Sequence, residues 1–130
     1  MTAVYKENSM EIKVLPCELS VCKAQSLMHI DLDEEPFFIG KTDEEISVVC
    51  RTEFVPADAT DRDDGWKAFC IQGMLDFSLT GILAKIAEIL AEEKISIFAI
   101  STFNTDYVLV RDENLDRALK ALSDNGYDIV

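Results

Sequence analysis

Residues 66–73 read WKAFCIQG and residues 79–93 read LTGILAKIAEILAEE, and these two runs decide the fold. The first is an apolar run that ends at a glycine, which is typical of a buried β-strand. In the second, apolar residues recur at the i, i+3, i+4, i+7 spacing that gathers them on one side of an α-helix: Leu79, Ile82, Leu83, Ile86, Ile89 and Leu90. The two runs therefore predict a strand followed by a helix with one buried face.

The remaining part of the second half continues this alternation. β-Branched and aromatic runs, a short turn, a second amphipathic run and a helix-ending Asn125-Gly126 pair follow in order. The elements they predict are a strand over residues 95–103, a turn at Asn104-Thr105, a strand over residues 106–111, a helix over residues 113–124 and a strand over residues 127–130. The order is β-α-β-β-α-β, the ferredoxin-like plan with both helices on one face of an antiparallel sheet.

The first half of the chain predicts strands and no convincing long helix. The strands are expected over residues 10–15, 18–24, 36–40 and 46–52. Residues 55–65 (VPADATDRDDG) are rich in proline, small residues and charges, which indicates a linker or an exposed loop. The fold class predicted is α+β, with a complete βαββαβ unit over residues 61–130 packed with a degenerate, mostly β unit over residues 1–60.

The charge of the chain excludes several functions. A formal net charge of −13 repels phosphate backbones and anionic lipid surfaces, so neither nucleic acid nor a membrane is expected as a partner. The acidic clusters at residues 31–35 and 58–64 lack the spacing of a calcium loop, so no metal site is predicted. No apolar stretch is long enough for a membrane span, and the N-terminus has no signal-peptide core.

The cysteines and the single histidine point away from catalysis. Cys17, Cys22, Cys50 and Cys70 form no CxxC motif, and three of them lie in apolar runs, which predicts reduced core residues in a cytoplasmic protein. His29 has no partner pattern, and the chain contains no Gly-x-Ser-x-Gly, P-loop or dinucleotide motif. The chain is therefore predicted to have no cofactor and not to be an enzyme.

Two segments of the second half resemble the ACT-domain proteins. They are residues 76–84 (DFSLTGILA) and residues 95–110 (ISIFAISTFNTDYVLV), which look like a family of small proteins carrying two ACT units in about this length. The C-terminal pattern is also similar to the cytosolic arginine sensors of animals and, more loosely, to aspartokinases. The first half resembles the first unit of the family through residues 14–16, 19–22, 37–38 and 44–50.

The resemblance implies a regulatory module with a ligand site at the start of its first helix. The implied ligand is a small amino acid effector held at the interface between ACT units, with a dimer of the chain and a partner enzyme or regulator as further expected partners. Free amides and the helix dipole at this position suit a carboxylate, and an acidic side chain on the neighbouring strand suits an ammonium or guanidinium group. The candidate ligand-binding residues are Ser78, Leu79, Thr80, Gly81, Ile82, Leu83, Thr102 and Asp106.

Each of these residues also has a purely structural interpretation. Ser78 or Thr80 could cap the helix, and Gly81 could permit tight packing of the helix on the sheet. Asp106 could bond its own turn, and Thr102 could simply be a strand residue. A structural interaction module that dimerises or docks without a small ligand is therefore the alternative function.

Overall fold

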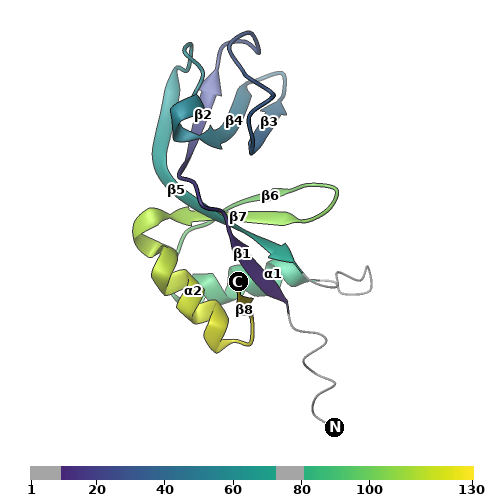
Figure 1. The fold of residues 1–130 in the computed structure, drawn as a ribbon, viewed down its shortest axis with the longest axis vertical. Helices are drawn as coiled ribbons and strands as arrows, with labels where there is room; N and C mark the ends of the chain where they lie inside the picture. The colour runs from purple at the N-terminus through teal and green to yellow at the C-terminus, as the bar shows by residue number, and fades with distance from the viewer. Residues whose placement is uncertain (1–9, 73–80) are drawn as a thin grey trace. The chain divides into compact units, whose positions relative to one another are not determined.

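The chain folds into two compact units. The computed structural model describes residues 10–72 and 81–130. The helical unit comprises Met1–Pro16 and Lys67–Val130, and the β unit comprises Cys17–Trp66. Figure 1 shows the course of the chain through both units, which are described separately below.

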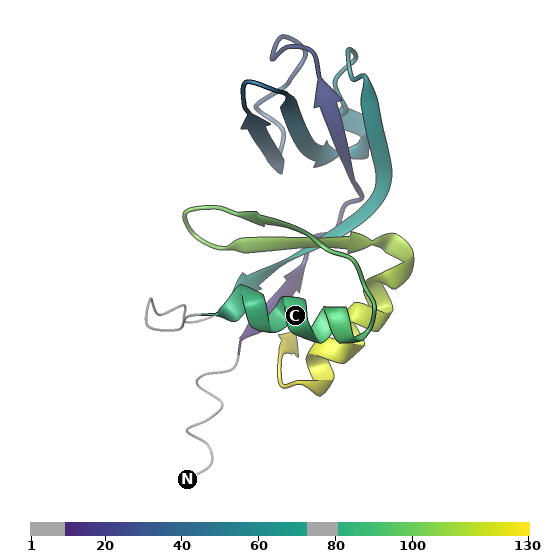
Figure 2. The ribbon, with the colours of Figure 1, turned by 180° about the vertical axis from the view of Figure 1, so that it is seen from behind.

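The helical unit contains the predicted order of elements. These are β5 (Asp61–Gln72), α1 (Ile82–Glu92), β6 (Phe98–Ser101), β7 (Asp106–Arg111), α2 (Leu115–Asp124) and β8 (Asp128–Ile129), with a short 3₁₀ turn at Asp112–Asn114 before α2. β6 pairs antiparallel with β7, and β7 pairs with β5. Both helices lie on one face of this sheet (Figures 1 and 2). The α+β class and the βαββαβ plan predicted for this half are confirmed.

One strand of this sheet comes from the N-terminal end of the chain. β1 (Glu11–Val14) lies between β5 and β8, antiparallel to the first and parallel to the second. The division at residue 60 had placed this segment in the first half. Ile12 explains its position, because this side chain is 0% exposed and belongs to the core of the helical unit. The second half therefore needs a fifth strand from residues 10–16 to complete its sheet.

The core of the helical unit lies between the sheet and the helices. Strands and helices both contribute fully buried apolar side chains to it, chiefly Ile12, Phe69, Ile71, Ile86, Leu90, Val108, Val110 and Leu122. The apolar stripe predicted for the first helix is confirmed, since Ile86 and Leu90 are buried while Ile82, Leu83 and Ile89 are partly buried against the same core. Gly126, with φ of 96°, follows α2 in the left-handed conformation expected where a helix ends.

The β unit has the strand order that the helical unit would have without β1, and it has no α-helix. β2 (Leu19–Ala24), β3 (Phe37–Lys41), β4 (Ile46–Arg51) and the first part of β5 are arranged in the order β3-β4-β2-β5. If β2, β3, β4 and β5 are numbered 1 to 4 along the chain, the order read from the β5 edge is 4-1-3-2. This is the strand order of a βαββαβ sheet. Residues 25–36 and a 3₁₀ turn at Thr52–Phe54 stand where the two helices of a complete unit would be. The mostly β character predicted for the first half is thus confirmed for Cys17–Trp66.

The segment interpreted as a linker is partly a strand. β5 begins at Asp61, and Asp61, Arg62 and Asp63 pair with β2. The prediction was wrong here because alternating charges carry no apolar periodicity, so nothing in this run marks a buried face. The units divide after Trp66, six residues beyond the boundary placed at residue 60.

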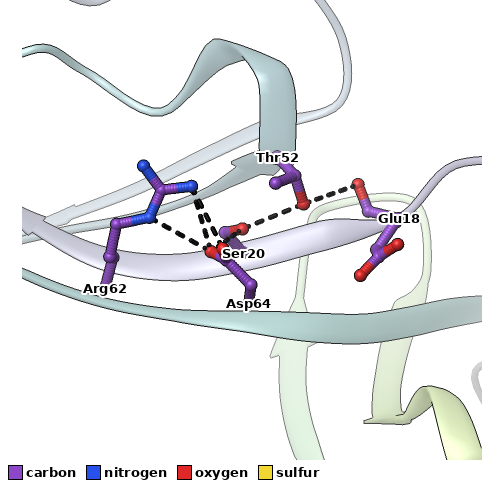
Figure 3. A network of polar contacts seen from close by, with 5 residues as sticks. All are labelled: Glu18, Ser20, Thr52, Arg62 and Asp64. Carbon is purple, nitrogen blue, oxygen red and sulfur yellow. Dashed lines mark hydrogen bonds and ion pairs between the residues drawn. The ribbon is translucent and has the colours of Figure 1, made fainter.

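A polar network fixes β5 to β2 within the β unit (Figure 3). Ser20 is 0% exposed, and its hydroxyl donates to Asp64 Oδ1 at 2.6 Å. Ser20 Oγ also lies 2.9 Å from Thr52 Oγ1, and the Thr52 hydroxyl lies within hydrogen-bond distance of the Glu18 carbonyl at 3.4 Å. The Arg62 guanidinium holds the Asp64 carboxylate from the other side at 3.2 Å. The network thereby satisfies a buried hydroxyl and orders the charged start of β5.

Substitution Ser20→Ala is expected to destabilise the protein by about 1–2 kcal/mol, because it removes a buried hydrogen-bonded group and leaves its partners to rearrange. Chemical denaturation measures this difference. The matched control is Ser47→Ala on β4, a half-buried serine whose loss should change stability by less than about 0.5 kcal/mol. Equal stability of the two variants would contradict the structural role given to Ser20.

The same variant should alter the response to acid. The Ser20 hydroxyl, followed by Arg62, lowers the pKa of the Asp64 carboxyl below its ordinary value of 3.8. A depressed pKa in the folded state contributes stability that is present above the ordinary value and is lost as the pH falls through the folded value. The stability difference between wild type and Ser20→Ala should therefore shrink below about pH 4, as a melting series against pH would show.

Three of the four cysteine side chains are core residues, as predicted. Cys22, Cys50 and Cys70 are buried, and Cys17 is half-buried. Burial raises the pKa of the Cys50 thiol to about 12, and it also raises the pKa of the Cys22 and Cys70 thiols. Thiols of this kind stay protonated and are poor nucleophiles. Within residues 10–72 and 81–130, no helix is long and apolar enough to span a membrane.

Candidate functional site

Gly81 begins the first helix in a conformation that favours glycine. It is the N-cap of α1 with φ of 77° and ψ of 14°, and its carbonyl accepts the amide of Lys85 at 2.9 Å. A Cβ built on Gly81 would meet no atom of the described residues within 4 Å. The interpretation that this glycine permits tight helix–sheet packing is therefore wrong, and its positive φ is the reason for its presence. Gly81 also leaves the first amides of α1 without a capping side chain at this position.

The turn between β6 and β7 carries the acidic candidate. The Ser101 hydroxyl donates to Asp106 Oδ1 at 2.6 Å across the first pair of the hairpin. This bond holds the Asp106 carboxylate in one orientation while its second oxygen remains a strong acceptor. Asp106 is half-buried, so its side chain is partly held by its neighbours and still accessible to a ligand from solvent.

The two threonines of the turn have different roles. The Thr102 hydroxyl donates to the Thr105 carbonyl at 3.0 Å and accepts the Thr105 amide at 3.3 Å, so it closes the turn itself. The Thr105 hydroxyl donates to the Ile71 carbonyl at 2.6 Å. This bond ties the start of β7 to the end of β5, from which the chain leads towards α1.

The start of α1 and the Asp106 turn lie at the same end of the helical unit. Both views of the ribbon show the turn and the first residues of α1 on one side, and the Thr105–Ile71 hydrogen bond joins the turn to the strand before α1 (Figures 1 and 2). A helix N-terminus, which carries partial positive charge, and an ordered carboxylate are thus presented at one end.

The candidate residues predicted from sequence fall into three groups. Ser78, Leu79 and Thr80 lie outside the described residues. Gly81 and Asp106 are at the end of the unit just described, whereas Thr102 is engaged in its own turn. Ile82 and Leu83 form the first turn of α1, and their side chains pack on the core. Only their backbone amides are therefore left as candidates for binding a ligand.

Two hydroxyl side chains beside the candidate residues have structural partners. Ser101 orients Asp106, and Thr105 anchors the hairpin to Ile71. The alternation of Ser101, Phe103 and Thr105 along the hairpin contains no signal that separates these roles. Among the described residues, no three His, Cys, Asp or Glu side chains gather as metal ligands would.

The fold of the second half is a βαββαβ module, and the comparisons with known proteins agree with it. The family model described as "ACT domain" matches residues 61–124. The second half of the chain is therefore an ACT domain, as its resemblance implied. ACT domains are regulatory modules, and this gives the second half its general class.

Solved structures extend the likeness over nearly the whole chain. The protein Atu0741 from Agobacterium tumefaciens is 28% identical, with a TM-score of 0.82 over 94% of this chain and 92% of that one. VC0802 from Vibrio cholerae, a protein of unknown function, is 21% identical, with a TM-score of 0.72 over 95% of this chain and 94% of that one.

A larger protein contains the same fold as one of its parts. The aspartate kinase of Clostridium acetobutylicum, described as an allosteric enzyme, is 13% identical with a TM-score of 0.64, and the match covers 90% of this chain and 34% of the kinase. At this identity the likeness shows the fold alone. The two-unit arrangement of strands is therefore found both in small proteins of this length and within an allosteric enzyme.

Proposed function

We propose that this ACT-domain protein is a non-catalytic cytoplasmic sensor that binds a small amino acid at the start of α1. The ligand carboxylate would accept the first amides of the helix, from Gly81 onward, together with the Ser78, Leu79 and Thr80 segment. Its ammonium or a cationic side chain would meet Asp106. A neighbouring ACT unit, in a dimer of the chain, would close the site, and binding would shift the pairing equilibrium.

One observation carries this proposal: the Asp106 carboxylate is ordered at the end of the unit where α1 begins. Ser101 holds this carboxylate at 2.6 Å, and Thr105 fixes the same turn to Ile71. Carboxylates bind well at helix N-termini, and charge-assisted hydrogen bonds to an ammonium group are among the stronger ones available. A zwitterionic amino acid would offer one charge to each, whereas a simple anion or cation would offer only one.

The functional class of the fold supports the same conclusion. An ACT domain whose fold recurs in an allosteric enzyme is expected to respond to a small effector. The response would be passed to an enzyme or regulator. Binding can shift an equilibrium between two states only through a difference in affinity, and a site shared between units supplies that difference.

A thermal-shift screen of the purified protein against the common amino acids tests the proposal. A ligand present at about 100 times its dissociation constant adds about 2.7 kcal/mol of stability, which raises the melting temperature by several degrees. We expect one amino acid class to give such a shift, and its D-enantiomer to give a much smaller one. Failure of every amino acid to shift the melting temperature would favour the alternative, a structural interaction module without a small ligand.

A further inference from the structure

The connection between β2 and β3 presents large apolar side chains to solvent. Leu27, Met28 and Leu32 are 48%, 81% and 71% exposed, all within residues 25–36, which we term the crossover loop. A single exposed apolar residue on a protein surface is ordinary. Three within six residues concentrate exposed apolar surface on one short loop, and exposed apolar surface of this kind marks interaction sites.

The crossover loop is held in place at its start and at its end. The Ser26 hydroxyl donates to Asp58 Oδ2 at 3.3 Å near its start, and Glu34 forms an ion pair with Arg51 at 4.0 Å near its end. Two turns, Ile30 N to Leu27 O at 3.3 Å and Glu34 N to Asp31 O at 3.2 Å, shape the part in between. The loop therefore has a defined course.

The middle of the loop has one apolar side chain inside and three outside. Ile30 packs on the core of the β unit formed by Cys22, Ala24, Val48 and Cys50. β2 and β3 are both antiparallel to β4, so this connection must cross from one end of the sheet to the other. This connection occupies the place of a helix in a complete βαββαβ unit, and Ile30 is the apolar side chain from its middle that packs on the core. Because Ile30 occupies the place on the core that this loop covers, Leu27, Met28 and Leu32 are left exposed to solvent.

Carboxylates alternate with these apolar side chains. Asp31, Asp33 and Glu35 are exposed, and the chain as a whole carries a net charge of −13. A second copy of the chain, a nucleic acid or an anionic lipid surface would bring further negative charge to this loop. A cationic partner would instead gain electrostatic attraction together with apolar burial.

We propose that the crossover loop docks an amphipathic, lysine- or arginine-rich segment of a partner protein. Apolar side chains of that segment cover Leu27, Met28 and Leu32, while its cationic side chains lie against Asp31, Asp33 and Glu35. This surface belongs to the β unit and is independent of the ligand site at α1, so either proposal can fail without the other.

The test uses the full chain and a fluorescent synthetic peptide in which leucines follow helical i, i+3, i+4, i+7 spacing and lysines fill the other positions. Fluorescence anisotropy is expected to show saturable binding that weakens as salt is raised to about 0.3 M. The triple variant Leu27→Ser, Met28→Ser, Leu32→Ser should bind at least about tenfold more weakly. The variant Asp31→Asn, Asp33→Asn, Glu35→Gln should also bind more weakly, with a smaller dependence on salt.

The controls separate this surface from general stickiness and from charge alone. Phe103→Ser removes a fully exposed apolar side chain (101%) from the helical unit and should leave peptide binding unchanged. All substituted side chains are exposed, so circular dichroism and melting should match wild type. Equal binding of a peptide with the same composition but scrambled spacing, or undiminished binding by the apolar triple variant, would overturn the proposal. The proposal would also be overturned if the protein bound neutral phosphatidylcholine vesicles but not the peptide.

Discussion

Substitution Ile12→Asp is expected to unfold the helical unit. Ile12 is 0% exposed on β1, opposite Ile71 of β5 and Ile129 of β8. An aspartate here would bury an unpaired carboxylate and remove the isoleucine from the core, at a cost of several kcal/mol. Because a domain of this kind is stable by only about 5–15 kcal/mol, most of the native population should be lost or should melt far earlier. Far-ultraviolet circular dichroism against temperature measures this.

The neighbouring substitution Lys13→Asp is the matched control. Lys13 is exposed on the same strand and pairs with Cys70, so the same new side chain should cost no more than about 1 kcal/mol there. A fragment of residues 61–130, which lacks β1, should likewise fail to fold cooperatively. An Ile12→Asp protein that melts like wild type, or a fragment that folds alone, would show that β1 is dispensable.

Substitution Asp106→Asn is expected to weaken binding of the amino acid selected by the thermal-shift screen about 10–100-fold. The change keeps the size of the side chain and an oxygen able to accept from Ser101, but it removes the negative charge proposed to meet the ligand ammonium. A hydrogen bond to a charged group contributes about 1.5–3 kcal/mol, which corresponds to this range of dissociation constants. Isothermal titration calorimetry of both proteins gives the comparison.

Asp112→Asn controls for the change in overall charge. Asp112 is exposed just after the far end of β7, so the variant alters net charge by the same amount away from the proposed site. It should bind the ligand like wild type. Equal dissociation constants for the Asp106→Asn and Asp112→Asn proteins would remove Asp106 from the site.

The helical unit was predictable because its elements carry strong local signals. The stripe that includes Ile86 and Leu90 has the helical period, the run Asp106–Arg111 is rich in β-branched and aromatic residues, and Gly126 ends α2 through its positive φ. Each of these signals depends only on near neighbours in the sequence.

The position of β1 and the start of β5 could not be predicted in the same way. A strand of four residues, Glu11–Val14, contains no information about which distant strand it pairs with. The charged residues that open β5 are held by long-range partners such as Ser20, 44 positions away from Asp64. Pairings of this kind depend on the whole sheet, and a single sequence does not display them.

The candidate site shows the same limit at the level of single side chains. The residue types at the hairpin turn suit a ligand and suit a turn equally well, and only the hydrogen bonds separate them. Thr102 closes the turn and Thr105 anchors it, whereas Asp106 is oriented by Ser101 with one oxygen to spare. Gly81 was singled out for the space around it, yet its backbone angle is what requires it.

The location of the ligand tests the central claim most directly. Amide chemical shifts of the full chain should be followed by nuclear magnetic resonance while the selected amino acid is added to saturation. The account predicts that the largest changes occur at Gly81, Ile82, Leu83 and the turn residues Thr102 to Asp106, with the β unit, Cys17–Trp66, almost unchanged. Largest changes within the β unit, or none near α1 and Asp106, would contradict it.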